Sequence, residues 1–390
     1  MNEIAHHQPS IQAIVLAAGK STRFKGKTTK LLTPLCGQPI IMYLTQLLES
    51  LDIATTLVVG HEAAAIQTLV GAQHKAVQFA QQTEQRGTGH ALKSSEPLWH
   101  ADHLLILNGD CPLIHAHTLK YLATTHAQNN NAVTFVTAHH PNPFNAYGRV
   151  IKKNKRISIV EARDLPDDPT KYDTVNAGIY IMQTAFLKKY MHLLGTNNAA
   201  QEYYITDLVG IAQNQGLRVG TISASFDEIC GINTLPELMR AEQVQRSRII
   251  YNHIENGVIF RSTDVYIDTP VTIQPGTVVG AGVHLLGNST IGQEAVLAPY
   301  CIVENSTIAD NVTVHEQTII KHSRVEAHAA VGPFAFVTRS TIDAHETVKS
   351  FVSVANDRVG TVSNTTVHAE SLVQAPEVTL AQTQRVQLNS

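Results

Sequence analysis

The sequence has few cysteines, few charged residues and no long apolar run. Its four cysteines, Cys36, Cys111, Cys230 and Cys301, are scattered. They lack the paired spacing of a zinc site and the density of a disulfide scaffold, so we interpret them as free thiols. Charged residues make up 16% of the chain and the net charge is −3, which favours neither disorder nor a nucleic-acid-binding surface.

No apolar run approaches the length that spans a bilayer, and the first ten residues, MNEIAHHQPS, lack the apolar stretch of a signal peptide. We therefore expect a cytoplasmic protein without membrane insertion. Because the composition also argues against nucleic acid, we expect its partners to be small molecules.

The length of 390 residues and an apolar fraction of 43% allow two domains. Up to residue 235, β-type runs alternate with helical segments such as 40–51 and 205–215, which predicts a mostly parallel sheet covered by helices. The β-type runs start near Leu57, Val77, Leu104, Val133 and Ile179. We expect domain 1–235 to be α/β, with ligands bound at the carboxyl ends of its strands.

The spacing of apolar residues changes after residue 235. Leu235, Leu238, Ile250 and other apolar residues recur at helical spacing up to Gly257, which predicts a linking helix over 236–257. Beyond it, apolar residues recur every six positions from Ile267 to Val303.

From Ile291 the step becomes six, six, five, so that similar triplets such as Ser306-Thr307-Ile308 stand 17 residues apart. A hexad repeat is typical of a parallel β-helix, in which each turn of a three-sided coil stacks on the next. We predict this fold for 258–355, followed by a weakly patterned segment over 356–390. The period-two alternation and hairpin turns of a β-sandwich are not found.

The first apolar run leads into a basic turn, AIVLAAGKSTRFKGKTTKLL from Ala13 to Leu32. The run reads as a buried strand, and Gly19 allows a tight turn where a phosphate can approach backbone N–H groups. Lys20, Arg23 and Lys30 can neutralise phosphate charge. Although many α/β proteins start with a strand and a glycine turn, the three basic residues favour a nucleoside triphosphate site.

Further motifs follow in order: QTEQRGTGHAL from Gln82, LNGDCPLI from Leu107, AYGRV, IVEARD, VNAGIYIM, QEYYITDL and GIN from Gly231. Together with LAAGKSTRF, they resemble the bacterial bifunctional N-acetylglucosamine-1-phosphate uridyltransferases/glucosamine-1-phosphate acetyltransferases, over roughly residues 13–350. The resemblance implies a Rossmann-like nucleotidyltransferase domain, a left-handed β-helix of hexapeptide repeats, and a homotrimer.

The same resemblance implies roles for individual residues. The nucleotide and its phosphates would be held by Ala17, Ala18, Gly19, Arg23 and Lys30, with Arg23 and Lys30 as the catalytic cations. The uracil would be read by Gln82, Gly87 and Thr88, the sugar bound by Gly148, Glu161 and Asn176, and Mg²⁺ held by Asp110 and Asn233. Tyr204 and Thr206 lie in a segment that would border the sugar site. Taken alone, most of these residues would be read as turns, caps or exposed strand positions.

The reaction implied is attack by a phosphate oxygen of N-acetylglucosamine-1-phosphate on the α-phosphorus of UTP, which gives UDP-N-acetylglucosamine and pyrophosphate. No protein nucleophile is needed, because the attacking group is already anionic. The barrier lies in bringing two polyanions together, which Mg²⁺ and the basic side chains would ease.

The acetyltransferase motifs are degraded. Thr338 stands where the resemblance predicts an arginine, although Arg339 is adjacent, and Ala355 or Asn356 stands where it predicts a lysine. The paired histidine and tyrosine of the general base have no counterpart, and His368 lies on the weakly patterned tail. Acetyl transfer is therefore not expected.

Two smaller departures concern the nucleotidyltransferase half. Ser21 stands where glycine is common, and Asn108 where an aromatic residue is common. One changed contact in a sugar pocket shifts discrimination by roughly 1–3 kcal/mol. Two alternatives therefore stay open: a sugar-1-phosphate nucleotidyltransferase of different sugar or nucleotide preference, and a non-catalytic scaffold that keeps the fold.

Overall fold

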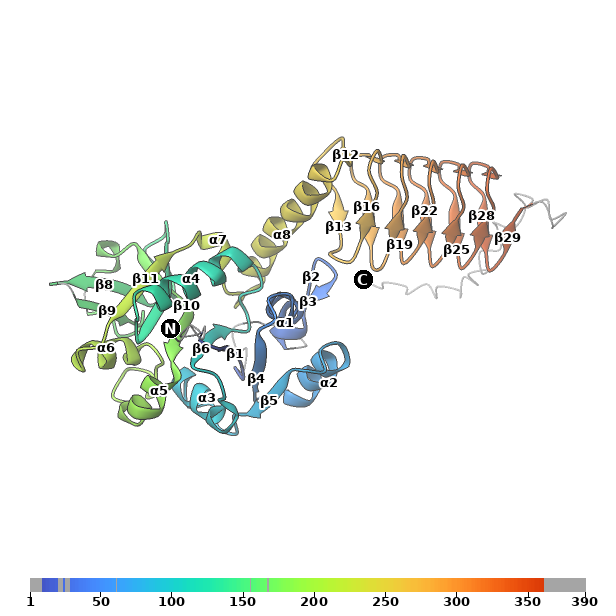
Figure 1. Cartoon of the computed structure of the whole chain (residues 1–390). Helices are drawn as coiled ribbons and strands as arrows, with labels where there is room; N and C mark the ends of the chain where they lie inside the picture. The colour runs from blue at the N-terminus through green and yellow to red at the C-terminus, as the bar shows by residue number, and fades with distance from the viewer. Residues whose placement is uncertain are drawn as a thin grey trace, which may run out of the picture. The chain divides into compact units, whose positions relative to one another are not determined.

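The structure, a computed structural model, describes residues 9–19, 24, 29–60, 62–154, 156–166 and 168–360 (Figure 1). Its contacts divide the chain into two compact units, Met1–Ser247 and Arg248–Ser390. The division falls inside helix α8 (Leu235–Glu255), the helix that the apolar spacing predicts between the two halves of the chain.

The first unit is built on a nine-stranded sheet whose main path is β11-β7-β10-β6-β1-β4-β5, with β8 paired to β10 and β9 paired to β8. The strands are β1 (Ile11–Ala17), β4 (Ala54–Val59), β5 (Gln78–Gln81), β6 (His103–Asn108), β7 (Val133–His139), β8 (Arg149–Lys153), β9 (Arg156–Val160), β10 (Thr174–Gln183) and β11 (Val219–Ser223). A separate hairpin joins β2 (Pro34–Leu35) to β3 (Gln38–Pro39).

β1 pairs in parallel with both β4 and β6, and β4 pairs in parallel with β5. Because both faces of these strands are covered, β1 is apolar at every position from Ala13 to Ala17 rather than alternating. β10 is antiparallel to both β6 and β7. Its register shifts between Asn176 and Tyr180, where Gly178 has a φ of +71° that a side chain would resist.

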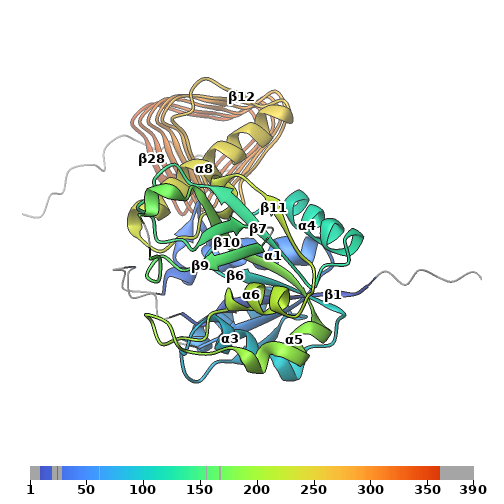
Figure 2. The ribbon, with the colours of Figure 1, turned by 90° about the vertical axis from the view of Figure 1, so that its left-hand side faces the viewer.

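Helices cover the two faces of the sheet, as Figure 2 shows. The buried residues of α1 (Ile40–Ser50), α2 (Ala63–Gln73) and α4 (Ala116–Gln128) join one core with Ala13, Val15 and neighbouring strand residues. Those of α3 (Thr88–Ser94), α5 (Thr184–Tyr190) and α6 (Asp207–Asn214) join a second core with Ile14. Alternate residues of β1 thus enter opposite cores, as a central strand requires.

Short elements complete the first unit. They are the 3-10 turns η1 (Lys30–Leu32), η2 (Glu96–Leu98), η3 (Pro169–Lys171) and η4 (Met191–Leu193), and helix α7 (Phe226–Ile229). The predicted helices 40–51 and 205–215 correspond to α1 and α6. No helix in the described ranges is long and apolar enough to cross a membrane.

The second unit consists of three parallel sheets of six strands each. The first holds β12 (Ile259–Phe260), β15 (Val278–Val279), β18 (Val296–Leu297), β21 (Thr313–Val314), β24 (Ala330–Val331) and β27 (Thr347–Val348). The second holds β13 (Tyr266–Ile267), β16 (His284–Leu286), β19 (Ile302–Glu304), β22 (Ile319–Lys321), β25 (Phe336–Thr338) and β28 (Ser353–Ala355). The third holds β14 (Thr272–Ile273), β17 (Thr290–Ile291), β20 (Thr307–Ile308), β23 (Arg324–Val325), β26 (Thr341–Ile342) and β29 (Arg358–Val359).

The pairing register confirms the repeat read from the sequence. Ile273 pairs with Ile291 one coil later, an 18-residue step, whereas Ile291 pairs with Ile308 after 17 residues. The hexad residues from Ile267 to Val303 are all buried. The prediction of a left-handed parallel β-helix of hexapeptide repeats is thereby confirmed, and β29 carries the coil past Ala355, where we expected it to end.

Serines at the 17-residue step form a hydrogen-bonded ladder inside the β-helix. Ser306 N–H donates to Ser289 Oγ at 3.3 Å, Ser323 N–H to Ser306 Oγ at 3.0 Å, and Ser340 N–H to Ser323 Oγ at 3.1 Å. Each hydroxyl in turn donates to a carbonyl of its own coil. The ladder satisfies backbone groups that the corner leaves out of the sheets.

Candidate active site

A cavity of about 500 Å³ opens at the carboxyl ends of the parallel strands. It is lined by Leu16, Ala17, Ala18, Gly19, Lys30, Leu31, Gln82, Gln85, Gly87, Thr88, Ala91, Asn108, Asp110 and Glu202. Seven of the eight residues predicted to bind the nucleotide therefore lie around one cavity, together with Asp110: Ala17, Ala18, Gly19, Lys30, Gln82, Gly87 and Thr88. Lys20 and Arg23 lie outside the described residues.

Strand register explains why these distant segments meet. Ala17 pairs with Val59, Val59 pairs with Gln81, and Leu16 pairs with Asn108, so β1, β4, β5 and β6 all end at the same edge. Polar residues that follow those strands must gather there.

The Gln82–Thr88 segment is held in a fixed shape beside that edge. Gln82 is buried, and its Nε2 donates to Gly87 O at 3.3 Å and contacts His90 Nδ1 at 3.0 Å. Gly87 has a φ of +103°, and a Cβ there would stand 2.6 Å from Tyr203 O, so only glycine fits. Thr88 Oγ1 accepts a hydrogen bond from Ile205 N–H at 3.1 Å.

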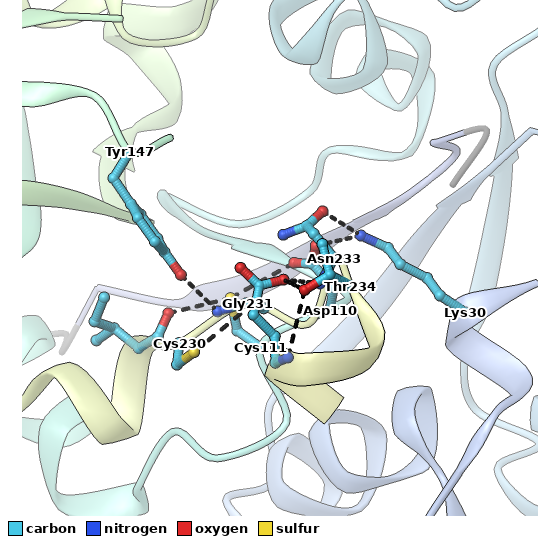
Figure 3. Close-up of polar contacts among 10 residues, drawn as sticks. Lys30, Asp110, Cys111, Tyr147, Cys230, Gly231, Asn233 and Thr234 are labelled. Carbon is cyan, nitrogen blue, oxygen red and sulfur yellow. Dashed lines mark hydrogen bonds and ion pairs between the residues drawn. The ribbon is translucent and has the colours of Figure 1, made fainter. Parts of the chain in front are cut away.

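Lys30 and Asp110, which line the cavity, meet Asn233 (Figure 3). Lys30 Nζ lies 2.5 Å from Asp110 Oδ2 and 2.9 Å from Asn233 Oδ1. The side chains of Lys30 and Asp110 are 12% and 17% exposed. In this half-buried setting an ammonium group stabilises the two oxygens that the sequence assigns to Mg²⁺.

The start of helix α8 positions Asn233. Glu237 Oε2 accepts hydrogen bonds from Asn233 N–H at 2.8 Å and from Thr234 Oγ1 at 3.0 Å, and Glu237 N–H donates back to Thr234 Oγ1 at 3.4 Å. This reciprocal arrangement resembles a capping box and fixes the helix terminus. Ile232 N–H donates to Asp110 O at 2.9 Å, which ties that terminus to the loop after β6.

The oxygens present suit a hard divalent cation. Asp110 and Asn233 offer carboxylate and amide oxygens to one point, which Lys30 Nζ contacts. Among the described residues no group of three His, Cys, Asp or Glu side chains could hold a metal ion. A Mg²⁺ ion here would therefore complete its coordination with water and substrate phosphate oxygens, as Mg²⁺ commonly does in phosphate-binding sites.

The three predicted sugar residues also come together. Asn176 N–H donates to Gly148 O at 2.9 Å, and a Cβ at Gly148 would stand 3.4 Å from Glu161 Oε2. Glu161 Oε1 accepts from Thr206 Oγ1 at 3.0 Å. Burial raises the pKa of the Glu161 carboxyl, and the Thr206 hydrogen bond opposes that shift.

Two residues that the sequence left without a role connect these parts. Tyr147 Oη accepts a hydrogen bond from Gly231 N–H at 3.0 Å (Figure 3). A Cβ at Gly231 would stand 3.4 Å from Asp110 Oδ1. Both residues belong to motifs visible in the sequence, AYGRV and GIN, but only the fold brings these motifs into contact.

All four cysteines are buried and none forms a disulfide, which confirms their interpretation as thiols. Burial and the adjacent Asp110 carboxylate raise the pKa of the Cys111 thiol, and burial raises that of Cys230. Because the thiolate is the reactive form, neither side chain is suited to act as a nucleophile beside the cavity.

Comparisons with known proteins agree with this geometry. Residues 13–165 match the MobA-like NTP transferase domain family, and residues 263–383 match the GMPPB C-terminal domain family. The chain is 36% identical to the bifunctional protein GlmU of Clostridioides difficile (strain 630) over 294 residues, which cover 74% of this chain and 63% of the relative. It is 37% identical to GlmU of Streptococcus gordonii over 292 residues, or 73% of this chain and 63% of the relative.

The chain is a homologue of these GlmU proteins. The match spans about 63% of their length. The resemblance read from the motifs is thus confirmed. A crystal structure of a proposed glucose-1-phosphate thymidylyltransferase from Bacillus anthracis shares the fold at 20% identity and a TM-score of 0.50, covering 60% of this chain and 95% of its own.

Proposed function

We propose that the chain is a Mg²⁺-dependent uridyltransferase that forms UDP-N-acetylglucosamine and pyrophosphate from UTP and N-acetylglucosamine-1-phosphate. The observation that supports this most directly is that Lys30 and Asp110 line the same cavity as Gly19, Gln82 and Gly87, and that Lys30 contacts both Asp110 and Asn233. The proposal assigns nucleotide, metal and sugar to adjoining parts of one edge of the sheet.

On the nucleotide side, Ala17, Ala18 and Gly19 offer backbone close to the triphosphate, and the Gln82–Thr88 segment offers amide and backbone groups to the uracil edge. Mg²⁺ held by Asp110 and Asn233 would neutralise phosphate charge and align the two substrates. Lys30, displaced from those oxygens, would then bind phosphate oxygens as a point charge, and we assign Arg23 the same task.

On the sugar side, Gly148, Glu161 and Asn176 lie close to one another. The raised pKa of Glu161 arises from burial, and its carboxyl oxygens suit sugar hydroxyl donors. Because the proposal puts the sugar phosphate beside the triphosphate, most of the rate would come from positioning and charge neutralisation rather than from a protein nucleophile.

The proposal is tested by pyrophosphate release from UTP and Mg²⁺, with N-acetylglucosamine-1-phosphate, glucosamine-1-phosphate and glucose-1-phosphate compared in one assay. A strong preference for the acetylated sugar is expected. No release with any sugar, together with no Mg²⁺-dependent UTP binding in calorimetry, would leave the non-catalytic scaffold in its place.

A second candidate, a nucleotidyltransferase with another sugar or nucleotide, is favoured by Asn108. This side chain lines the cavity, and its Nδ2 would stand 2.3 Å from a Cβ at Gly178, next to the sugar residue Asn176. A short amide here offers hydrogen-bonding groups where the resemblance leads us to expect an aromatic ring. Equal or faster turnover with another sugar-1-phosphate or another nucleoside triphosphate would support this candidate.

We further propose that the β-helix has no acetyltransferase activity. Thr338 lies in β25 and Ala355 ends β28, so neither supplies a cation where acetyl-coenzyme A phosphates would need one. Exposed Arg339 has a φ of +48° at the following corner, which turns the chain away from the strand. Release of free coenzyme A from acetyl-coenzyme A and glucosamine-1-phosphate should stay at background.

A further inference from the structure

Arg149 is a buried arginine without an acidic partner. It lies in β8 between Val175 of β10 and Val160 of β9, and its side chain is 1% exposed. No ion pair found among the described residues includes it. Burying an unpaired charge is costly, and an apolar residue of similar volume would often serve stability as well or better.

The hydrogen bonds that the Arg149 side chain makes with described residues all go to one short segment, 143–147. Nη2 donates to Pro143 O at 2.5 Å and to Asn145 O at 3.2 Å. Nη1 donates to Asn145 Oδ1 at 2.9 Å and to Tyr147 O. The planar guanidinium, with donors in a fixed fork, thus holds three carbonyls and one side-chain oxygen of the same loop.

The loop has internal hydrogen bonds of its own, and Arg149 contacts the end of the loop that leads into β8. Asn145 Oδ1 accepts from Tyr147 N–H at 2.9 Å, and it is this same oxygen that Arg149 contacts. Tyr147 then directs its hydroxyl to Gly231 N–H, 3.0 Å away. The next residue after Gly231, Ile232, donates to Asp110 O at 2.9 Å.

We propose that Arg149 is a positioning residue that clamps loop 143–147, so that the Tyr147–Gly231 hydrogen bond aligns Gly148, the predicted sugar-binding residue before β8, with the Asp110–Asn233 pair. The clamp acts through the loop and does not touch substrate. Its role in turnover rests on the proposed function, whereas its effect on the loop does not.

A purely packing role predicts a different outcome. Loss of packing would lower stability and affect the binding of both substrates alike. The clamp predicts an effect on the sugar side, because Gly148 directly follows the loop, whereas the nucleotide side depends on β1, β5 and α3, which the clamp does not contact.

The test compares Arg149→Met, Arg149→Lys and Tyr147→Phe with the control Arg218→Met, since exposed Arg218 also donates to a backbone carbonyl, Asn129 O. In the full chain, amide hydrogen exchange should accelerate over 143–147 in both Arg149 variants, less with lysine. Amide exchange at Gly231 should accelerate in the Arg149 variants and also in Tyr147→Phe. The Arg218→Met control should show wild-type exchange rates.

In turnover, Arg149→Met should raise the KM for the sugar phosphate about tenfold and leave the KM for UTP within about twofold, with partial rescue by lysine. Wild-type exchange at Gly231 in Arg149→Met, or equal rises in both KM values, would overturn the clamp. If Arg149→Met does not fold, Tyr147→Phe decides by the same KM comparison. If wild type turns over no sugar phosphate, the proposed function fails, and the exchange data alone decide the clamp.

Discussion

At the scale of single residues, Lys30 shows how the site is prepared for charge. Its ammonium group bonds to Asp110 and Asn233, two residues that lie far from it in the chain. In the proposed reaction the cation that stabilises these oxygens is exchanged for Mg²⁺, and Lys30 becomes available to the phosphates. Before the metal binds, the Lys30 ammonium group thus compensates the negative charge of the Asp110 carboxylate.

Asp110→Ala should lower pyrophosphate release by more than tenfold, because it removes the one carboxylate among the two predicted metal ligands. Steady-state rates over a range of Mg²⁺ concentrations measure this. The control is Asp227→Asn, a change at a half-exposed carboxylate that pairs with Arg240. An Asp110→Ala enzyme that keeps more than a tenth of the wild-type rate would contradict the metal assignment.

His126 predicts a pH effect on stability. It is buried in α4, with Nδ1 2.9 Å from Thr134 Oγ1 and Nε2 3.0 Å from His103 Nδ1. Burial, and secondly the charge of His103, lower its pKa from 6.5 to about 3. The folded state thus favours neutral His126, while the unfolded chain takes up a proton below pH 6.5.

The free energy of unfolding contributed by His126 is therefore complete above pH 6.5 and is lost as the pH falls toward 3, at about 1.4 kcal/mol per pH unit. Urea titrations between pH 7 and pH 5, with His126→Gln beside wild type, should show a shallower loss in the variant. Exposed His100 supplies the control His100→Gln. Parallel curves for wild type and His126→Gln would refute the prediction.

At the scale of elements, periodic patterns were read correctly. The apolar runs near Leu57, Leu104 and Val133 are strands, and the hexad repeat is a β-helix. The antiparallel setting of β10 and the β8–β9 hairpin were not foreseen. Strand direction is decided by pairing between segments distant in sequence, and an apolar run reads the same in either direction.

The serine ladder gives an element-scale prediction. In Ser323→Ala the hydroxyl that accepts Ser340 N–H is lost, so a buried amide is left without its partner. The cost should be about 1–3 kcal/mol in the free energy of unfolding of the β-helix. Calorimetric unfolding of the full chain measures it, with the exposed Ser353→Ala of β28 as the control. Equal transitions in the two variants would show that the ladder contributes nothing.

At the scale of the whole molecule, the β-helix exposes an aromatic corner. Phe334 and Phe351 stack with ring centroids 5.0 Å apart, and both side chains are exposed, as is Tyr300, which lies two steps of the same corner before Phe334. Contiguous exposed apolar surface often marks an interface. We propose that a homotrimer forms through the β-helix, as the resemblance implies.

Light scattering at micromolar concentration should give three times the chain mass of 42.5 kDa. Phe351→Glu should lower that mass, because a carboxylate in an apolar contact costs desolvation energy. The control is Lys349→Glu, an exposed charged position two residues away. A wild-type monomer would contradict the trimer.

The sequence by itself determined those features whose signal is local. A six-residue repeat specifies a β-helix because each coil repeats the same contacts, and a strand followed by Gly19 and basic residues indicates a phosphate site within twenty positions. Tertiary structure alone decided that Lys30 contacts Asp110 and Asn233. It also decided that Tyr147 contacts Gly231 and that the guanidinium of Arg149 donates its hydrogen bonds to loop 143–147. These contacts join segments up to 203 residues apart, and no local pattern carries the register that brings them together.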